Sequence, residues 1–177
     1  LSDLSQNLKG DTWEINIMLE TIKEIIDDVL KRMEEDINIP YSEDAAKLIF
    51  ETGMAESGYR ALEGYGEGNP AVSFWQIEPA TVRDIWENYI SYRKPMIEAV
   101  YKLGLIEDEK VFSVFSNIAL ASAFCRIHYR RMPGAIPKTM PGRAQYWKKF
   151  YNTYKGKGTV DHYVGANMEN FDPREPV

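Results

Sequence analysis

The sequence predicts a mainly α-helical fold with a small irregular or β insertion at residues 62–79. Apolar residues recur at helical spacing along most of the 177-residue chain. The insertion interrupts this pattern with helix-breaking residues, namely Gly64, Gly66, Gly68, Asn69 and Pro70. The length suits one domain that can bury a sizeable core, together with an N-terminal extension.

The N-terminal segment predicts an amphipathic helix of about 20 residues. Its apolar stripe follows steps of three and four residues: Ile15, Leu19, Ile22, Ile26, Val29 and Met33. Asp11 or Thr12 could cap it, and Pro40 follows its end. The stripe either packs on the domain or contacts another subunit. We therefore expect an extension at 1–40, a domain at 41–165 and a loose tail at 166–177.

The next helix begins after Ser42, a suitable N-cap, and runs toward Glu56. Beyond the insertion, helical spacing resumes at Val82, is kinked or restarted by Pro95 and closes at Gly104.

The most apolar helix is expected to begin at Asp108, to run through Phe124 and to form the buried centre of the domain. After a proline-rich connection, Pro141 lies in the first turn of another helix. Thr159 is expected to cap the last helix.

Composition excludes several classes of protein. The single cysteine, Cys125, rules out a disulfide framework within the chain and is expected to be a buried, inert thiol. No apolar run has the length of a membrane span, and no secretory signal is visible at the start. Because the chain begins at Leu1 rather than at Met, we expect a processed or excised segment of a longer protein.

The charge is unevenly distributed. The net charge is −6, yet residues 111–160 hold nine Lys and Arg and no Asp or Glu. This region is either a solvated face or the positive wall of a groove for an anionic polymer. Nucleic acid is disfavoured as a partner because no binding motif accompanies the charge and the whole chain is acidic.

Glu56 is the strongest candidate for a catalytic group. A carboxyl at the end of an apolar helix loses hydration, which raises its pKa and lets it donate a proton to a departing glycosidic oxygen. The alternative is a helix-end carboxylate bound to backbone or to Arg60. Glu67 and Glu78 flank the glycine-rich segment and are candidates for the second carboxylate that an inverting hydrolase needs, although each could be a simple surface charge. Glu51 ranks below them because it points to another helix face.

The residues around Gln76 favour a sugar site. Gln76 lies between Trp75 and Ile77, and alternation predicts that its amide faces a groove. The aromatic side chains of Tyr59, Tyr65, Trp75 and Tyr151 are candidate platforms or polar handles. No metal or cofactor is expected, because His128 and His162 have no ligand residues at suitable spacing.

Four segments, taken in order, resemble the soluble lytic transglycosylase and goose-type lysozyme superfamily. Glu56-Ser57-Gly58-Tyr59 resembles "ESxF", and the segment from Ser73 to Thr81 resembles "GLMQ(I)xPxT". Residues 117–124 resemble "NIxxGAxYL", and Tyr151-Asn152-Thr153 with the Gly-Lys-Gly that follows resembles "AYNxGxGxVxxYL".

The resemblance implies a lysozyme-like α+β fold and a muramidase that cleaves the β-1,4 bond between N-acetylmuramic acid and N-acetylglucosamine. Glu56 would be the general acid, and Gln76 and Tyr151 would hold the sugar. The motif residues Ser57, Tyr59, Ser73, Trp75 and Asn152 complete the implied substrate-binding set. The chain departs from the pattern at Ser73-Phe74-Trp75, which is bulkier than the family's Gly-Leu-Met.

Two further likenesses bear on mechanism. Residues 64–67 resemble the goose-type "GWGD", and residues 76–78 resemble its "QVD", which places Glu67 and Glu78 where that branch has water-positioning aspartates. Their participation implies hydrolysis. Without it, the sugar's own 6-hydroxyl would attack and give an anhydro product.

We therefore expect a peptidoglycan-degrading enzyme, either a lysozyme or a lytic transglycosylase. Softer likenesses to bacteriophage proteins favour a virion-associated domain that acts on the bacterial cell wall, with glycan strands as its partner. The alternative is a non-catalytic virion or tail component that contacts other virion proteins. The bulky Phe74-Trp75 pair and the N-terminal stripe motivate this alternative.

Overall fold

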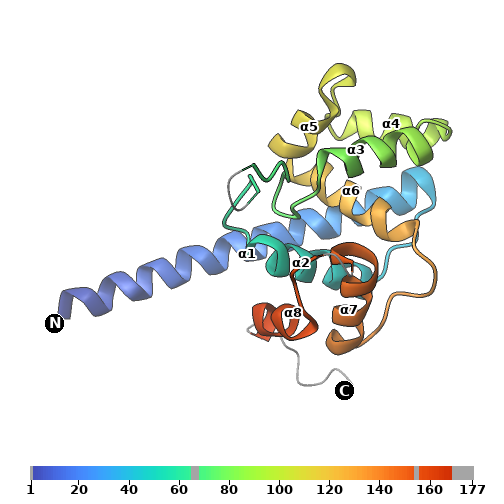
Figure 1. Cartoon of the computed structure of the whole chain (residues 1–177). Coiled ribbons are helices and arrows are strands. Elements are labelled where there is room, and N and C mark those ends of the chain that lie inside the picture. The colour runs from blue at the N-terminus through green and yellow to red at the C-terminus, as the bar shows by residue number, and fades with distance from the viewer. Residues whose placement is uncertain (1, 65–67, 154–155, 169–177) are drawn as a thin grey trace.

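The computed structural model is mainly α-helical, as predicted (Figure 1). It describes residues 2–64, 68–153 and 156–168, with side chains from residue 14 onward. The α-helices within these ranges are α1 (Ser2–Ile37), α2 (Glu43–Ser57), α3 (Pro79–Ile85), α4 (Lys94–Lys102), α5 (Lys110–Ser116), α6 (Ile118–Arg130), α7 (Met140–Trp147) and α8 (Val160–Asn167). Two π-helical turns, η1 (Trp86–Ile90) and η3 (Lys148–Asn152), continue α3 and α7, and a 3₁₀ turn, η2 (Glu107–Glu109), precedes α5.

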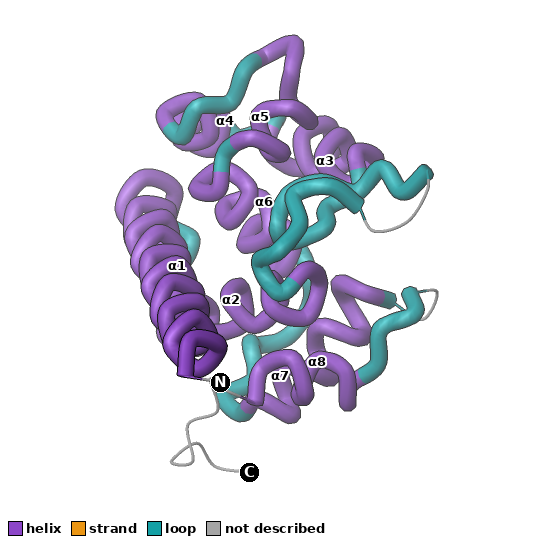
Figure 2. The backbone as a smooth tube through the Cα atoms, turned by 90° about the vertical axis from the view of Figure 1, so that its left-hand side faces the viewer, coloured by secondary structure: helices purple, strands orange, loops and turns teal. Residues whose placement is uncertain are grey.

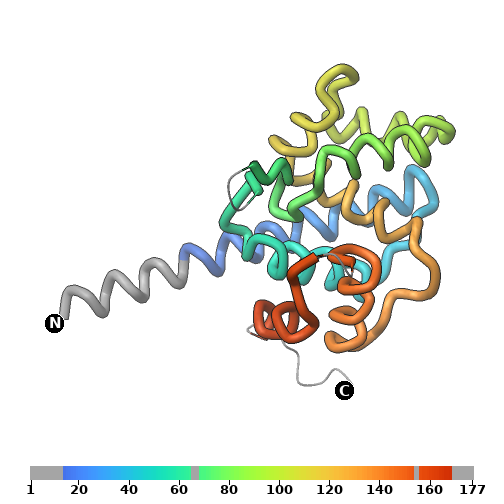
Figure 3. The backbone as a smooth tube through the Cα atoms, viewed as in Figure 1, coloured from blue at the N-terminus to red at the C-terminus, as the bar shows by residue number. Residues whose placement is uncertain are grey.

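Helix α1 is longer than the predicted helix and has two environments. From Ile22 to Met33 its apolar stripe is buried in the core that α2 and α6 also form, so this part packs on the domain. The part of α1 that precedes this stretch, from residue 14, extends beyond α2 (Figure 3). There Ile15, Ile17 and Met18 are exposed.

Three of the predicted helix-start signals are confirmed. Ser42 Oγ accepts a hydrogen bond from Ala45 N at 3.1 Å, and Thr159 Oγ1 accepts one from His162 N at 3.0 Å. Pro141 lies in the first turn of α7, where its missing N–H costs nothing.

The predicted continuous helix over 108–124 is wrong. The chain forms α5 and α6, which meet at an angle of 101° at Asn117. Asn117 Oδ1 accepts from Leu120 N at 3.0 Å and its Nδ2 donates to Leu103 O at 2.7 Å, so this one side chain caps α6 and anchors the bend. Helix α6 is the buried centre of the domain, and Cys125 on it is a buried thiol, as expected.

Evidence for a membrane-spanning helix among the described residues is weak. No single helix there combines the necessary length and hydropathy, and only the bent pair of residues 107–116 and 118–130 meets the criterion, by length and composition alone.

The insertion is irregular. Residues 61–78 form no strand within their described part, and their pairing is limited to two isolated antiparallel bridges, Glu63 with Val72 and Val72 with Ile77. The expectation of an irregular segment is confirmed, whereas a β-sheet is not formed there. This loop and the one that follows η3 both lie on the side of the molecule away from α1 (Figure 2).

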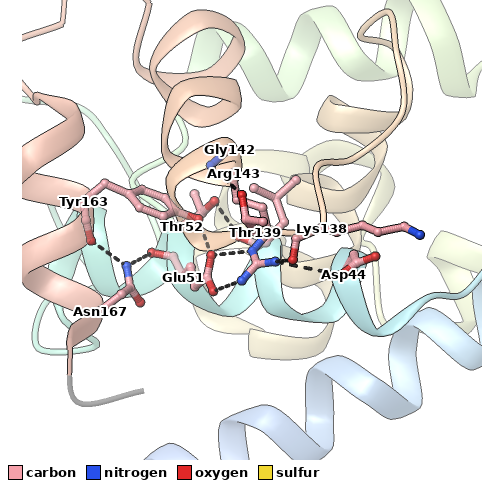
Figure 4. Close-up of polar contacts among 10 residues, drawn as sticks. Asp44, Glu51, Thr52, Lys138, Thr139, Gly142, Arg143, Tyr163 and Asn167 are labelled. Carbon is pink, nitrogen blue, oxygen red and sulfur yellow. Dashed lines mark hydrogen bonds and ion pairs between the residues drawn. The ribbon is translucent and has the colours of Figure 1, made fainter. Parts of the chain in front are cut away.

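A buried ion pair ties α2 to α7 and α8 (Figure 4). Arg143 Nη2 and Nε donate to the two carboxylate oxygens of Glu51 at 2.7 and 2.8 Å, and Tyr163 Oη donates to Oε2 of Glu51 at 2.8 Å. Asn167, which is fully buried, donates to Glu51 O at 3.1 Å. Residue 167 thus belongs to the folded body rather than to the expected tail, and residues 169–177 lie outside the described part.

Candidate active site

The end of α2 positions Glu56 beside the insertion. Its neighbours Ala55 and Ser57 are buried, and the left-handed conformation of Gly58 (φ 58°) ends the helix one residue later. Ser57 Oγ donates a hydrogen bond of 2.7 Å to Phe74 O. The helix end and the insertion are thereby joined, and the half-buried Glu56 side chain is left facing the space between them and α7.

The surroundings of Glu56 favour a protonated carboxyl. Burial raises the pKa of Glu56 to about 7, and the Trp147 hydrogen bond and the charge of His162 offset this only in part. The indole Nε1–H of Trp147 donates to Glu56 Oε1 at 2.9 Å. The side chain is therefore held by α7 and not by Arg60, and it can carry a proton near neutral pH.

Glu56 lies on the wall of a cavity of about 780 Å³. Its lining comes from helices α2, α3, α6, α7 and α8, from η3 and from two loops. The contributing residues are Ala55, Glu56, Asn69, Ala71, 76–78, Thr81, His128, Trp147, 150–153, 156–158 and His162. Cavities of this size accommodate small organic ligands, including sugar units.

Four predicted site residues line this cavity with Glu56: Gln76, Glu78, Tyr151 and Asn152. The alternation argument for Gln76 is confirmed, since Trp75 and Ile77 are buried and Gln76 is turned toward the cavity. Its Nε2 donates to Ser73 O at 3.0 Å, which leaves the amide oxygen for a ligand. Tyr151 Oη donates to Trp75 O at 2.7 Å, so its ring rather than its hydroxyl is offered to the cavity.

Four other predicted binding residues do not line the cavity: Ser57, Tyr59, Ser73 and Trp75. Their side chains are buried, so they offer neither a ring nor a hydroxyl to a ligand in this cavity. Trp75 is fully buried and its Nε1 donates to Ile49 O at 2.8 Å, while Tyr59 Oη donates to Phe50 O at 3.0 Å. These side chains pack in the interior and hold the backbone on which the site is built.

Of the two candidates for a second carboxylate, Glu78 is the one that lies within the described residues. Glu78 is exposed on the cavity wall, at the N-cap position of α3. Glu67 and Tyr65 lie outside the described residues.

Three cavity residues, Trp147, His162 and His128, were not predicted as site residues. Trp147 is buried and approaches the chain closely at Gly158, where an added Cβ would lie 2.5 Å from the indole, so only glycine fits there. His162 Nε2 donates to Ala55 O at 2.7 Å, and His128 Nε2 donates to Phe150 O at 2.8 Å. The Gly-Lys-Gly motif was the one signal that pointed to this close contact.

Several non-glycine residues around the site have left-handed backbone conformations. Tyr59, Ser73 and Gln76 have positive φ angles of 55°, 68° and 49°, although none is glycine. Such conformations cost free energy and concentrate at functional sites. Here they turn the chain sharply on both sides of the contact between Ser57 and Phe74.

The chemistry open to this site is proton transfer by a carboxyl group. The described residues contain no group of three or more His, Cys, Asp and Glu side chains placed to hold a metal ion. Comparisons with protein-family models, curated proteins and solved structures find no match to this chain. Its function is therefore argued from the geometry of Glu56 and its cavity.

Proposed function

We propose that this protein cleaves glycosidic bonds, with Glu56 as the general acid. The observation that carries the proposal is a half-buried carboxyl on the wall of a 780 Å³ cavity, fixed by an indole N–H and with its pKa raised to about 7. Glycoside cleavage needs a carboxylic acid that stays protonated until the leaving oxygen takes its proton.

The hydrogen bond with Trp147 indicates which oxygen of Glu56 carries the proton. An indole N–H can only donate, so Oε1 acts as its acceptor and the proton is better placed on Oε2. Transfer of that proton to the bridging oxygen accompanies cleavage of the bond from that oxygen to the sugar's anomeric carbon. The departing sugar leaves as an alcohol, and an oxocarbenium-like centre develops on the other side.

The developing cation is then captured by an oxygen nucleophile. With Glu78 as the base, water loses one proton to the carboxylate and adds to the anomeric carbon, which gives a reducing end. If Glu78 does not act in this way, the 6-hydroxyl of the same sugar adds instead, loses its proton to the Glu56 carboxylate formed in the first step and gives a 1,6-anhydro end. Glu78 is exposed in the same cavity as Glu56, which favours hydrolysis.

We propose peptidoglycan as the substrate. The resemblance of the four motifs to the soluble lytic transglycosylase and goose-type lysozyme superfamily supports this choice. The cavity adds hydrogen-bonding amides at Asn69, Gln76 and Asn152 and a ring at Tyr151, which suit acetamido groups and sugar faces. A virion-associated domain that acts on the host cell wall fits this activity.

The direct test is to incubate the protein with purified sacculi and to analyse the soluble products by mass spectrometry. Release of disaccharide muropeptides with reducing ends supports hydrolysis, and release of anhydro ends supports transglycosylation. If no disaccharide product appears, the proposed activity is wrong.

The second candidate function is a structural role in a virion. The exposed apolar side chains of Ile15, Ile17 and Met18, close together on α1, favour it, because contiguous exposed apolar patches mark contacts with other proteins. A stable oligomer without lytic activity, measured by light scattering and a zymogram, would support this role.

A further inference from the structure

Arg126 is a buried cation. The side chain is 5% exposed, its Nη2 donates to Pro40 O at 3.2 Å, and its Nε has no hydrogen-bond partner among the residues that the structure describes. Within the described residues, no carboxylate lies within ion-pair distance of it. A guanidinium taken out of water is costly unless an anion compensates it.

Other arginines gather near Arg126 instead of acids. Arg130 lies four residues later on the same face of α6, and its positive charge, after burial, lowers the pKa of Arg126. Tyr89 also interacts with Arg126 and carries two more guanidinium groups on its ring, those of Arg93 at 4.0 Å and Arg131 at 5.9 Å from the ring centroid.

We call Arg93, Arg126, Arg130 and Arg131 the arginine cluster. Among the described residues, one acid forms an ion pair with it, since Asp84 Oδ2 lies 2.7 Å from Arg131 Nη1. Arg93 and Arg130 are exposed and form no ion pair in that part of the chain. The cluster therefore carries positive charge that the described side chains leave uncompensated.

Arg131, one member of the arginine cluster, lies near the cavity wall, because it pairs with Asp84 and both charges act on His128, which lines the cavity. Thr81 on α3 and His128 on α6 both line the cavity, and Asp84 and Arg131 each follow three residues later. Three residues are nearly one helical turn, about 5 Å along the axis. A polymer that leaves the cavity past Thr81 and His128 therefore meets Arg131 first. Arg126 and Arg130 come two residues before and two residues after His128, so they project from nearly the opposite side of α6.

We propose that the arginine cluster is an oxyanion-binding subsite, which takes carboxylate or phosphate groups carried by the polymer in the cavity. Guanidinium groups bind both oxyanions through paired, charge-assisted hydrogen bonds. On the proposed cell-wall substrate, these groups belong to peptide stems or to phosphate-bearing wall polymers. The role on the polymer rests on the proposed function, whereas binding of the free anion does not.

The first experiment uses inorganic phosphate as the probe. In ¹⁵N-labelled protein, the Arg126 Nε–H resonance is followed while potassium phosphate replaces potassium chloride at constant ionic strength. We expect a saturable shift, with affinity about tenfold weaker in Arg130→Gln and in Arg93→Gln. Arg32→Gln, an exposed arginine on α1, is the matched control and should leave the affinity unchanged. A resonance that responds to phosphate no more than to chloride overturns the proposal.

The second experiment identifies the source of the anion. Retention of the Glu56→Gln protein is measured on sacculi with intact stems, on sacculi stripped of stems by an amidase and on sacculi freed of phosphate polymers by hydrofluoric acid. Loss of retention on one of the stripped samples, reduced likewise by Arg130→Gln, identifies the carrier. Equal retention in every sample and variant overturns the role on the polymer. Phosphate binding by a protein that cleaves no sacculi would refute the proposed function while leaving the anion site intact.

Discussion

The indole of Trp147 and the carboxyl of Glu56, 91 residues apart in the chain, form a hydrogen bond of 2.9 Å at the wall of the cavity. The bond joins the end of α7 to the end of α2, and it occupies one carboxyl oxygen of Glu56, Oε1. This single contact both orients the proposed acid and moderates its pKa. It accordingly gives the first prediction.

Replacing Trp147 with Phe should shift the pH dependence of catalysis. The hydrogen bond from Trp147 lowers the pKa of Glu56, so its loss should raise that pKa above about 7 and move the alkaline limb of the rate profile to higher pH. The maximal rate should fall by about tenfold or more, because the carboxyl loses its orientation.

The measurement is the rate of sacculus clearing from pH 4 to 9, and Trp86→Phe, outside the cavity, is the control. An alkaline limb that stays in place in Trp147→Phe would show that the indole does not govern Glu56.

The raised pKa of Glu56 should make the free energy of unfolding depend on pH. The native state holds this proton up to about pH 7, whereas the unfolded chain releases it near 4.5. Glu56 therefore stabilises the fold fully below about pH 4.5, and this contribution is lost as the pH rises through about 7. The loss is at most about 3 kcal/mol.

Urea unfolding at pH 5 and pH 8 measures this effect. The parental protein should lose free energy of unfolding over that interval, and Glu56→Gln, which cannot ionise, should lose less. Equal pH dependence in the two proteins would contradict the raised pKa.

The buried ion pair between Glu51 and Arg143 predicts a large effect on stability. Replacing Arg143 with Met leaves the Glu51 carboxylate buried without its cation, which should cost about 3–5 kcal/mol of unfolding free energy. Adding Glu51→Gln should recover part of this loss, since the uncompensated charge is then removed.

Urea denaturation of the two single variants and the double variant tests this coupling. Strictly additive losses would show that the two side chains do not depend on each other.

Local signals in the sequence anticipated much of the helical architecture. Ser42, Pro141 and Thr159 act where predicted, because capping depends only on neighbouring backbone groups. The break at Asn117 was missed since its second partner, the carbonyl of Leu103, is 14 residues away and no local pattern reveals it.

The site was only partly predictable for the same reason. Alternation correctly predicts that Gln76 faces the cavity. The same alternation buries Ser73 and Trp75, which motif membership and, for Trp75, its aromatic ring had suggested as binding residues. Trp147 resembled an ordinary core aromatic, because its contact with Glu56 arises only when α2 and α7 pack together.

Glu78 should determine whether the products carry reducing ends or 1,6-anhydro ends. If its carboxylate activates water, Glu78→Gln should lower the yield of reducing ends by about a hundredfold and leave stability unchanged, since the side chain is exposed. Glu63→Gln, an exposed glutamate of the same insertion that does not line the cavity, is the control. Mass spectrometry of released muropeptides distinguishes the ends, and an unchanged yield would exclude Glu78 from this role.

The role of Glu56 as donor of the proton that breaks a glycosidic bond is tested most directly by comparing the parental protein with Glu56→Gln on purified sacculi. The substitution keeps an acceptor for the Trp147 indole and removes only the transferable proton, so the fold should persist. We predict that soluble muropeptide release falls by at least about a hundredfold while the circular dichroism spectrum is unchanged. Release at the parental rate by a folded Glu56→Gln protein would contradict the account.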